Sequence, residues 1–177
     1  MKTHIILLRG INVSGQKLIK MEALRKAFAD AGFPGARTLI QSGNIILQSE
    51  KTGEEIARKA SEIIAANFGF EVTPIVLDPD MLRTSLENLP FDGPGNKVYL
   101  VFLSSEPAAD VATQWKGLDF GHDKTVLSGR MLYVFYGDSA GKSKLTLNVI
   151  EKKLGVKGTA RNLNTARKLL EMTRDAQ

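Results

Sequence analysis

The 177-residue chain contains no cysteine, only two histidines and one tryptophan, and aromatic residues make up 7% of it. The lack of cysteine excludes disulfide frameworks, cysteine-ligated zinc sites and thiol catalysis. No apolar run approaches the roughly 20 residues that a membrane-spanning helix needs. Residues 1–12 hold an apolar stretch that is too short for a signal peptide. We therefore expect a cytoplasmic protein without membrane association.

What is present is the composition of an ordinary folded protein, with 43% hydrophobic and 24% charged residues. The formal net charge is +5, and its excess lies in residues 142–177, where nine basic residues stand against three acidic ones. Such a segment can steer phosphate groups or nucleic acid to a surface. A basic helix face that merely stays solvated gives the same pattern, so charge alone does not choose between them.

Short apolar runs and helical periodicity alternate along the chain, and the same order of elements occurs twice. The first half has strand patterns at residues 4–9, 37–48 (a hairpin turning at 42–44) and 71–77, and helical patterns at 21–31 and 54–68. After a linking helix at 79–88, the second half has strand patterns at 98–103, 125–127, 130–136 and 156–160, and helical patterns at 107–116, 143–154 and 162–173.

This order predicts an α+β fold of two ferredoxin-like βαββα(β) halves packed together. The predicted divisions are residues 1–78, a linking helix and loop at 79–96, and residues 97–177, which end in a basic helix. In the split βαβ arrangement the first and third strands are central. Those positions carry IILL, NIIL, VYLVFL and MLYVFY, the most apolar strands of the chain. Because they do not alternate between apolar and polar residues, we expect cover on both sheet faces, by helices on one and by the other half or a partner chain on the second.

Residues 137–143, GDSAGKS, follow a predicted strand and precede a predicted helix, which is the context of a phosphate-binding P-loop. That loop needs four residues between its glycines, and this segment has three, so its amides cannot form the same phosphate nest. Ser139 and Lys142 have the S-x-x-K spacing of an acyl-enzyme nucleophile. A solvated glycine-rich loop would not activate that lysine, and the motif predicts no such chemistry.

The two histidines do not indicate a metal site or a catalytic group. His122 lies near Asp119 and Asp123, but His4 belongs to the other half of the chain. A solvated loop histidine is the simpler interpretation of His122, and we expect no metal site and no cofactor. Spacing assembles no serine–histidine–acid group and no pair of carboxylates, so no catalytic residue is assigned.

One pattern suggests RNA binding. Residues 98–103 differ by one residue, Phe102, from the first RNA-contact motif of an RRM domain, and residues 133–136 match the last four positions of its longer motif. Tyr99 and Tyr133 would then stack bases on the sheet, with the basic C-terminal segment beside them. The alternative is that both rings pack in the interface between the two halves and each hydroxyl reaches a partner.

A group of polar residues lies at the ends of the predicted elements, and two of its parts open predicted helices. A helix start offers unpaired amides and a positive partial charge, which together with a neighbouring Lys or Arg favour an anion. Simple capping by Ser143 and Asn162 gives the same pattern, each cap stabilising its helix by roughly 1 kcal/mol. The candidate residues are Arg9, Asn12, Gln41, Ser42, Asn44, Ser143, Lys144, Arg161, Asn162 and Asn164.

Three segments, LLRGINVSG (7–15), RTLIQSGNIIL (37–47) and SKLTLNVIEKKLGVKGTARNLNT (143–165), resemble the bacterial domain of unknown function 1697 family. The resemblance implies a small cytoplasmic α+β protein of two ferredoxin-like halves, and it brings no established activity, cofactor or substrate. The chain departs from the family pattern at Ser14, where glycine is common, at Leu39, where an aromatic is common, and at Leu163, where tryptophan is common. A stacking role at that last position would be absent here. The family's motifs fall on the polar candidates.

The first hypothesis is therefore a binding protein for a small anionic ligand, phosphorylated or nucleotide-like. Arg9, Lys144 and Arg161 would hold the anion, and the amides at Ser143 and Asn162 would surround it. The side chains of Asn12, Gln41 and Asn164 would contact the ligand's polar remainder. The alternatives are an RNA-binding module that uses Tyr99 and Tyr133, and a protein–protein interaction module in which apolar sheets pair two chains.

Overall fold

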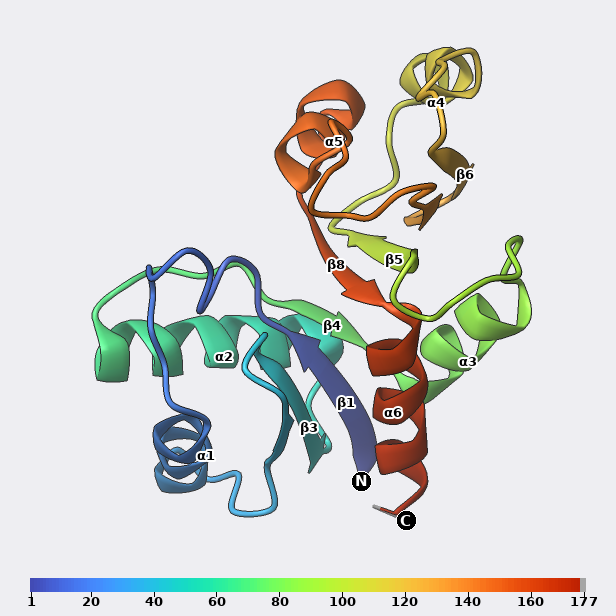
Figure 1. The fold of residues 1–177 in the computed structure, drawn as a ribbon. Coiled ribbons are helices and arrows are strands. Elements are labelled where there is room, and N and C mark those ends of the chain that lie inside the picture. Colours follow the sequence, from blue (N-terminus) through green and yellow to red (C-terminus); the bar gives the residue numbers. More distant parts are fainter. Residues whose placement is uncertain (176–177) are drawn as a thin grey trace. The chain divides into compact units, whose positions relative to one another are not determined.

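The computed structural model describes residues 1–175 and divides into two compact units (Figure 1). Unit 1 comprises Met1–Arg83 and the end of the chain from Leu169 onward, and unit 2 comprises Thr84–Lys168. The helix of residues 79–87 and the C-terminal helix of residues 163–174 are therefore each divided between the units. The predicted division instead placed the boundary at 79–96 and the whole last helix in the second half.

Within the described residues, none of the helices combines the length and the apolar character that crossing a membrane requires.

Unit 1 contains one four-stranded sheet in which all neighbouring strands are antiparallel. The strand order is β2-β3-β1-β4, so the first and third strands are central, as the split βαβ pattern predicts. Pro74 precedes β4, which lies at the sheet edge. The elements are β1 (Lys2–Leu7), α1 (Met21–Asp30), β2 (Arg37–Leu39), β3 (Asn44–Ser49), α2 (Gly53–Phe68) and β4 (Ile75–Leu77).

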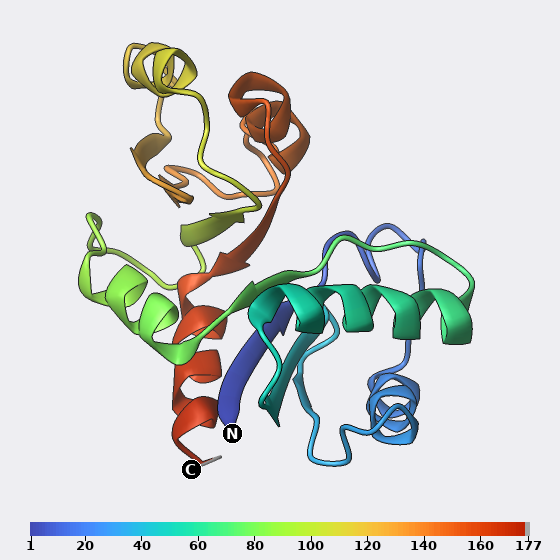
Figure 2. The same ribbon diagram turned by 180° about the vertical axis from the view of Figure 1, so that it is seen from behind.

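Both faces of this sheet are buried, as the lack of alternation predicts. On one face Ile6 and Ile45 belong to a core that includes apolar residues of α1 and α2. On the other face Ile5 and Ile46 are also fully buried. The part of α6 (Leu163–Arg174) that belongs to unit 1 lies beside β1 in both views (Figures 1 and 2) and supplies the buried residues Leu169, Leu170 and Thr173.

Unit 2 repeats the arrangement, with strand order β6-β7-β5-β8 and antiparallel neighbours throughout. Helices α4 and α5 pack on one face, where Val101, Leu132 and Val134 join Trp115 and Ile150 in a second core. The chain is thus α+β with two repeated halves. Its remaining elements are α3 (Pro79–Glu87), β5 (Val98–Leu103), α4 (Ala109–Lys116), β6 (Lys124–Ser128), β7 (Met131–Phe135), α5 (Leu147–Leu154) and β8 (Gly158–Asn162).

Helix α5 begins at Leu147, four residues later than the sequence pattern predicts, so the expectation that Ser143 caps it was wrong. Thr146 is the cap, and its Oγ1 accepts a hydrogen bond from the Val149 amide. Ser143 instead accepts a hydrogen bond from the Leu145 amide within the preceding loop. Asn162 does cap α6, since its Oδ1 accepts from the Thr165 amide at 2.9 Å.

Tyr136 joins the end of β7 to the loop before α5. Its hydroxyl donates to the Leu145 carbonyl at 3.0 Å, and the side chain is 6% exposed. Burial, with a smaller contribution from the charge of Asp123, raises the pKa of Tyr136 to about 12. The phenol therefore stays neutral in the folded state at a pH where it ionises in the unfolded chain.

We expect this shift to make Tyr136 a source of alkaline instability. Because the folded pKa of about 12 exceeds the unfolded value of roughly 10, its contribution is complete below pH 10 and is lost as the pH rises toward 12. Tyr136→Phe, which cannot titrate, loses one hydrogen bond and is less stable at pH 8 by about 1 kcal/mol. By pH 11 the wild type should lose about 1.4 kcal/mol of stability that the variant keeps, so in urea unfolding Tyr136→Phe becomes slightly the more stable of the two. A difference that does not change with pH contradicts the assignment.

Candidate functional site

In unit 1 the polar candidates gather where a long loop, residues 8–20, meets the turn between β2 and β3. The Asn12 side chain donates to the carbonyls of Ile19 (3.0 Å) and Gln41 (2.7 Å). Its Oδ1 accepts from the Ile19 amide at 2.7 Å. Both amide hydrogens and the carbonyl oxygen of Asn12 are thus used, and the residue ties the loop to the turn.

Asn44, which is completely buried, holds the turn in the same way. Its Nδ2 donates to the Leu39 carbonyl and to Ser42 Oγ, both at 2.9 Å. Gly43, which stands between Ser42 and Asn44, has a φ of +79°, and a Cβ on it would lie 2.6 Å from the Ile11 side chain. The turn therefore needs both the left-handed conformation and the small volume of glycine.

The backbone of these two segments is unusual. The non-glycine residues with positive φ in the described part of the chain are Asn12, Ser14, Lys17 and Ile40, and all of them lie here. Such conformations cost of order 1 kcal/mol or more for a residue with a Cβ, and for the β-branched Ile40 the conformation is an outlier. The structure brings Arg9, Asn12, Gln41, Ser42 and Asn44 into one region, where the two asparagines hold the strained backbone.

The contacts of Asn12 predict a large cost for its removal. Asn12→Ala leaves two carbonyls and one amide without their partner and should lower the free energy of unfolding by about 1–3 kcal/mol in a urea titration. Asn148→Ala, at an exposed asparagine of α5, is the matched control and should change it by less than about 0.5 kcal/mol. Equal costs at the two positions would show that the Asn12 contacts do not hold the loop.

In unit 2 the candidates at the β8–α6 junction also serve the backbone. Arg161 is 6% exposed, and its Nη1 donates to Thr159 Oγ1 at 2.6 Å and to the Ala160 carbonyl at 2.9 Å. Burial lowers the pKa of Arg161 to about 10, so the guanidinium keeps its charge at neutral pH. Asn164 lies so close to Gly95 that a Cβ on the glycine would meet its Oδ1 at 1.9 Å.

Ser143 and Lys144 lie elsewhere in unit 2, at a pocket of about 450 Å³ beside α5. This pocket combines predicted candidates with several charged side chains. Its lining brings together the loop after α4, the loop between β7 and α5, and one face of α5. We call it the lysine pocket; its lining residues are Asp119, Phe120, Gly121, His122, Asp123, Asp138, Ser139, Lys142, Ser143, Lys144, Leu145, Val149 and Lys153.

Asp123 organises this pocket. Its Oδ1 accepts from the Gly137 amide at 3.0 Å, and its Oδ2 accepts from the Ser143 hydroxyl. Ser143 Oγ in turn accepts from the Leu145 amide at 2.9 Å. A Cβ on Gly137 would lie 2.5 Å from the His122 carbonyl oxygen, so the two loops approach as closely as glycine permits. Both carboxylate oxygens are thus committed to holding the loop of residues 137–145.

In the described part of the chain, the lysine ammonium groups of the pocket, unlike the Asp123 carboxylate, make no contacts that hold the loop. Lys142, Lys144 and Lys153 are all exposed, and within residues 1–175 none of their ammonium groups forms a hydrogen bond or an ion pair. His122 Nδ1 lies 3.6 Å from Asp138 Oδ2, and both side chains are largely exposed. The described residues contain no group of three or more His, Cys, Asp or Glu side chains that could hold a metal ion.

The structure corrects the predicted RNA platform. Tyr99 pairs opposite Val134, and Tyr133 pairs opposite Leu100, so the two rings project from opposite faces of the sheet. Tyr133 is 4% exposed and donates its hydroxyl to the Ser85 carbonyl at 2.7 Å. Tyr99 packs edge-on against the Tyr136 ring at 5.2 Å. The two rings therefore cannot form a shared stacking surface: Tyr133 is buried, and Tyr99 is half-buried against the second core.

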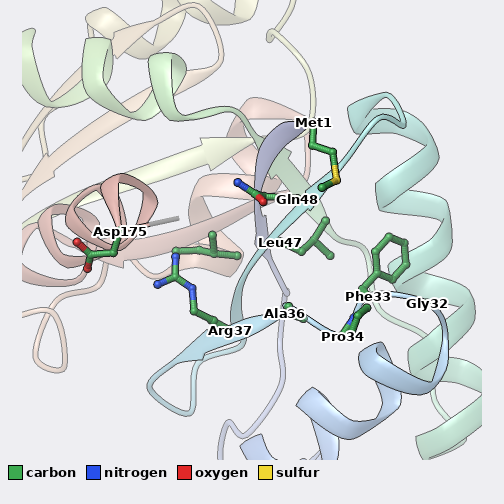
Figure 3. Close-up of a pocket in the computed structure, with 11 residues that line it drawn as sticks. Met1, Gly32, Phe33, Pro34, Ala36, Arg37, Leu47, Gln48 and Asp175 are labelled. Atoms are coloured by element: carbon green, nitrogen blue, oxygen red, sulfur yellow. The ribbon is translucent and has the colours of Figure 1, made fainter. Parts of the chain in front are cut away.

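A further pocket, of about 460 Å³, lies at the edge of the unit 1 sheet (Figure 3). Phe33, Pro34 and Leu47 supply an apolar side, and Arg37 and Asp175 lie across from Phe33. Arg37 Nη2 donates to the Met172 carbonyl, so this guanidinium already serves to fasten α6. None of the predicted site residues lines this pocket.

Sequence reasoning missed Asp123 and Lys153 as parts of one site. Asp123 entered only as a neighbour of His122, and Lys153 only as one of many basic residues. The available signal was the i, i+4 spacing of Val149 and Lys153, which places both on one helix face. Nothing local indicates that this face meets a loop 30 residues earlier in the chain.

Comparison with known proteins identifies the family through a family model and the fold through a solved structure. The model of the family described as "Protein of unknown function (DUF1697)" matches residues 1–133. A solved structure, the conserved bacterial protein SP0830 from Streptococcus pneumoniae, is similar with a TM-score of 0.75 and 22% identity over 97% of this chain and 98% of that one. No curated protein matches the chain significantly. Because the family model covers three quarters of the sequence, the chain belongs to the DUF1697 family of proteins of unknown function.

Proposed function

We propose that the chain binds a small anionic ligand, phosphorylated or nucleotide-like, in the lysine pocket of unit 2. The observation that carries the proposal is the set of three exposed ammonium groups, on Lys142, Lys144 and Lys153, that surround one pocket without internal partners. Lysine is a compact, strongly hydrated point charge that commonly binds phosphate. Unpaired cations around a concave surface therefore favour an anion of matching size.

The volume and the rest of the lining support the same ligand class. The pocket's 450 Å³ lies in the range of small-molecule sites. Asp123 is engaged by two donors from the protein, so its charge is already partly compensated. Asp119 and Asp138 also line the pocket, and their carboxylates suit hydroxyl or amino groups on the part of the ligand that is not anionic. This pattern fits a phosphorylated polar molecule better than a bare inorganic anion.

Of the residues predicted to bind, the proposal keeps Ser143 and Lys144 at the pocket. Ser143 acts through Asp123 and the loop rather than by capping α5, whereas Lys144 supplies charge directly. Asn12, Asn44, Arg161 and Asn162 have side-chain contacts that account for their presence without a ligand. We assign no catalytic residue at the pocket, and we propose binding without a reaction.

The chain offers a matched pair of variants for the test. Lys152 and Lys153 are adjacent exposed lysines in the last turn of α5, but only Lys153 lines the pocket. Calorimetric titration at low salt with pyrophosphate, ribose 5-phosphate and ATP should detect binding, and Lys153→Ala should weaken it about tenfold. Lys152→Ala removes the same charge at the same helix end and should weaken it less than about twofold.

Two outcomes would contradict the proposal. Equal losses in Lys152→Ala and Lys153→Ala would mean that only the general positive charge attracts the anion. No heat and no thermal shift with any of the three ligands would mean that the lysines are simply solvated. A ligand at one hundred times its dissociation constant stabilises the protein by about 2.7 kcal/mol, which a melting experiment readily detects.

A further inference from the structure

The outer edge of β6 carries main-chain groups that have no partner. β6 lies at the end of its sheet and pairs only with β7. The two strands are joined by a two-residue turn in which Gly129 has a φ of +58°, and Ser128 pairs with Met131. In such a hairpin the closing pair exchanges both hydrogen bonds. The amides and carbonyls of Thr125 and Leu127 must therefore point away from β7, out of the sheet.

Nothing in the described residues meets these groups. Apart from its pairing with β7, Thr125 makes one hydrogen bond within the described residues, in which its Oγ1 accepts from Trp115 Nε1 at 3.0 Å. This bond places the Thr125 side chain on the face of the sheet that α4 covers. An open edge is a template for another strand, and proteins commonly protect it with a bulge, a proline or a covering loop. The sequence of β6, KTVLS, has no proline, and its five residues pair with β7 without a bulge. A lysine can also protect an edge, but Lys124 stands at the start of β6, outside the outward-pointing groups of Thr125 and Leu127.

A groove with exposed apolar side chains lies beside this edge. A groove of about 460 Å³ is formed by the end of α4, the loop that follows it, and β6 itself. Its lining includes Leu118 and Val126, which are 42% and 39% exposed and are among the few large apolar side chains that meet solvent. An added strand would cover both and would place alternate side chains in the groove.

We propose that the occupant of this edge is a second copy of the chain, whose β6 pairs antiparallel with the first about Val126. The proposal is independent of the anion site. In this register Thr125 faces the partner's Leu127 and Leu127 faces the partner's Thr125, so all the outward groups pair in four hydrogen bonds. Val126 faces its own copy across the symmetry axis. The two sheets join into one of eight strands.

The register about Val126 suits a second copy, because β6 brings no charge repulsion to its own axis. Its single charged residue, Lys124, stands opposite the partner's Ser128, so no like charges face each other. The contact is isologous, as in most homodimers, so two copies complete it, and β8 and its copy become the edge strands of the joined sheet. The partner's Leu127 comes to lie beside Thr125, next to the groove, where its apolar side chain meets Leu118 and Trp115.

The absence of cysteine makes a direct test available. Across the axis Val126 and its copy form a non-hydrogen-bonded pair, whose Cα atoms lie about 4.5 Å apart, within disulfide range. Val126→Cys at micromolar concentration should form a covalent dimer almost completely when oxidised with glutathione disulfide. Val13→Cys is the matched control, because Val13 is an even more exposed valine in unit 1, and it should stay largely monomeric.

Sedimentation equilibrium of the unmodified chain should show a dimer, and Val126→Lys should raise the dissociation constant at least about tenfold by placing two ammonium groups on the axis. Val13→Lys, which adds the same charge in unit 1, should leave the dissociation constant unchanged. Since both valines are exposed, neither substitution should affect folding, and circular dichroism checks this. A monomer at 100 micromolar, or equal cross-linking of the two cysteine variants, would overturn the proposal.

Discussion

The burial of both faces of each four-stranded sheet is the constraint on which the rest of the structure depends. Central strands such as Val98–Leu103 and Asn44–Ser49 are apolar on both sides, so helices and neighbouring segments must cover them. Because the sheet faces are buried, binding surfaces can lie only at the loops at the strand ends and at the outer edges of the sheets. The lysine pocket is of the first kind, and the edge of β6 is of the second.

The loops in both units are held by single polar side chains that satisfy several backbone groups at once. Asn12 and Asn44 do this in unit 1, and Asp123 does it in unit 2. A buried or half-buried amide or carboxylate in such a position fixes an irregular backbone that has no ladder or helix to satisfy it. Polar residues at element ends therefore divide into those that hold the loop and those, such as Lys142 and Lys153, whose ammonium groups are exposed and form no hydrogen bond or ion pair with the described residues.

The sequence predicted that the first and third strands of each half are central, and it predicted Val98–Leu103 to the residue, because long apolar runs and hairpin turns are local signals. It placed the start of α5 wrongly because Ser143 and Thr146 are both good caps, and only the contact with Asp123 removes Ser143 from that role. The opposite orientation of Tyr99 and Tyr133 depends on the register between two strands, which periodicity within each strand does not fix. Likewise, Lys153 and Asp123 line the same pocket only because of tertiary packing, which no local sequence pattern indicates.

The central claim is that an anion is held at the lysine pocket rather than at the strained loops of unit 1. An amide-resolved NMR titration of the full chain with pyrophosphate tests it most directly, because it observes both regions in one sample. We predict saturable shifts at residues 142–146 and 153, with the signals of residues 9–17 and 40–44 unchanged. Saturable shifts at residues 9–17 and 40–44, with the signals of the pocket residues unchanged, would contradict the claim.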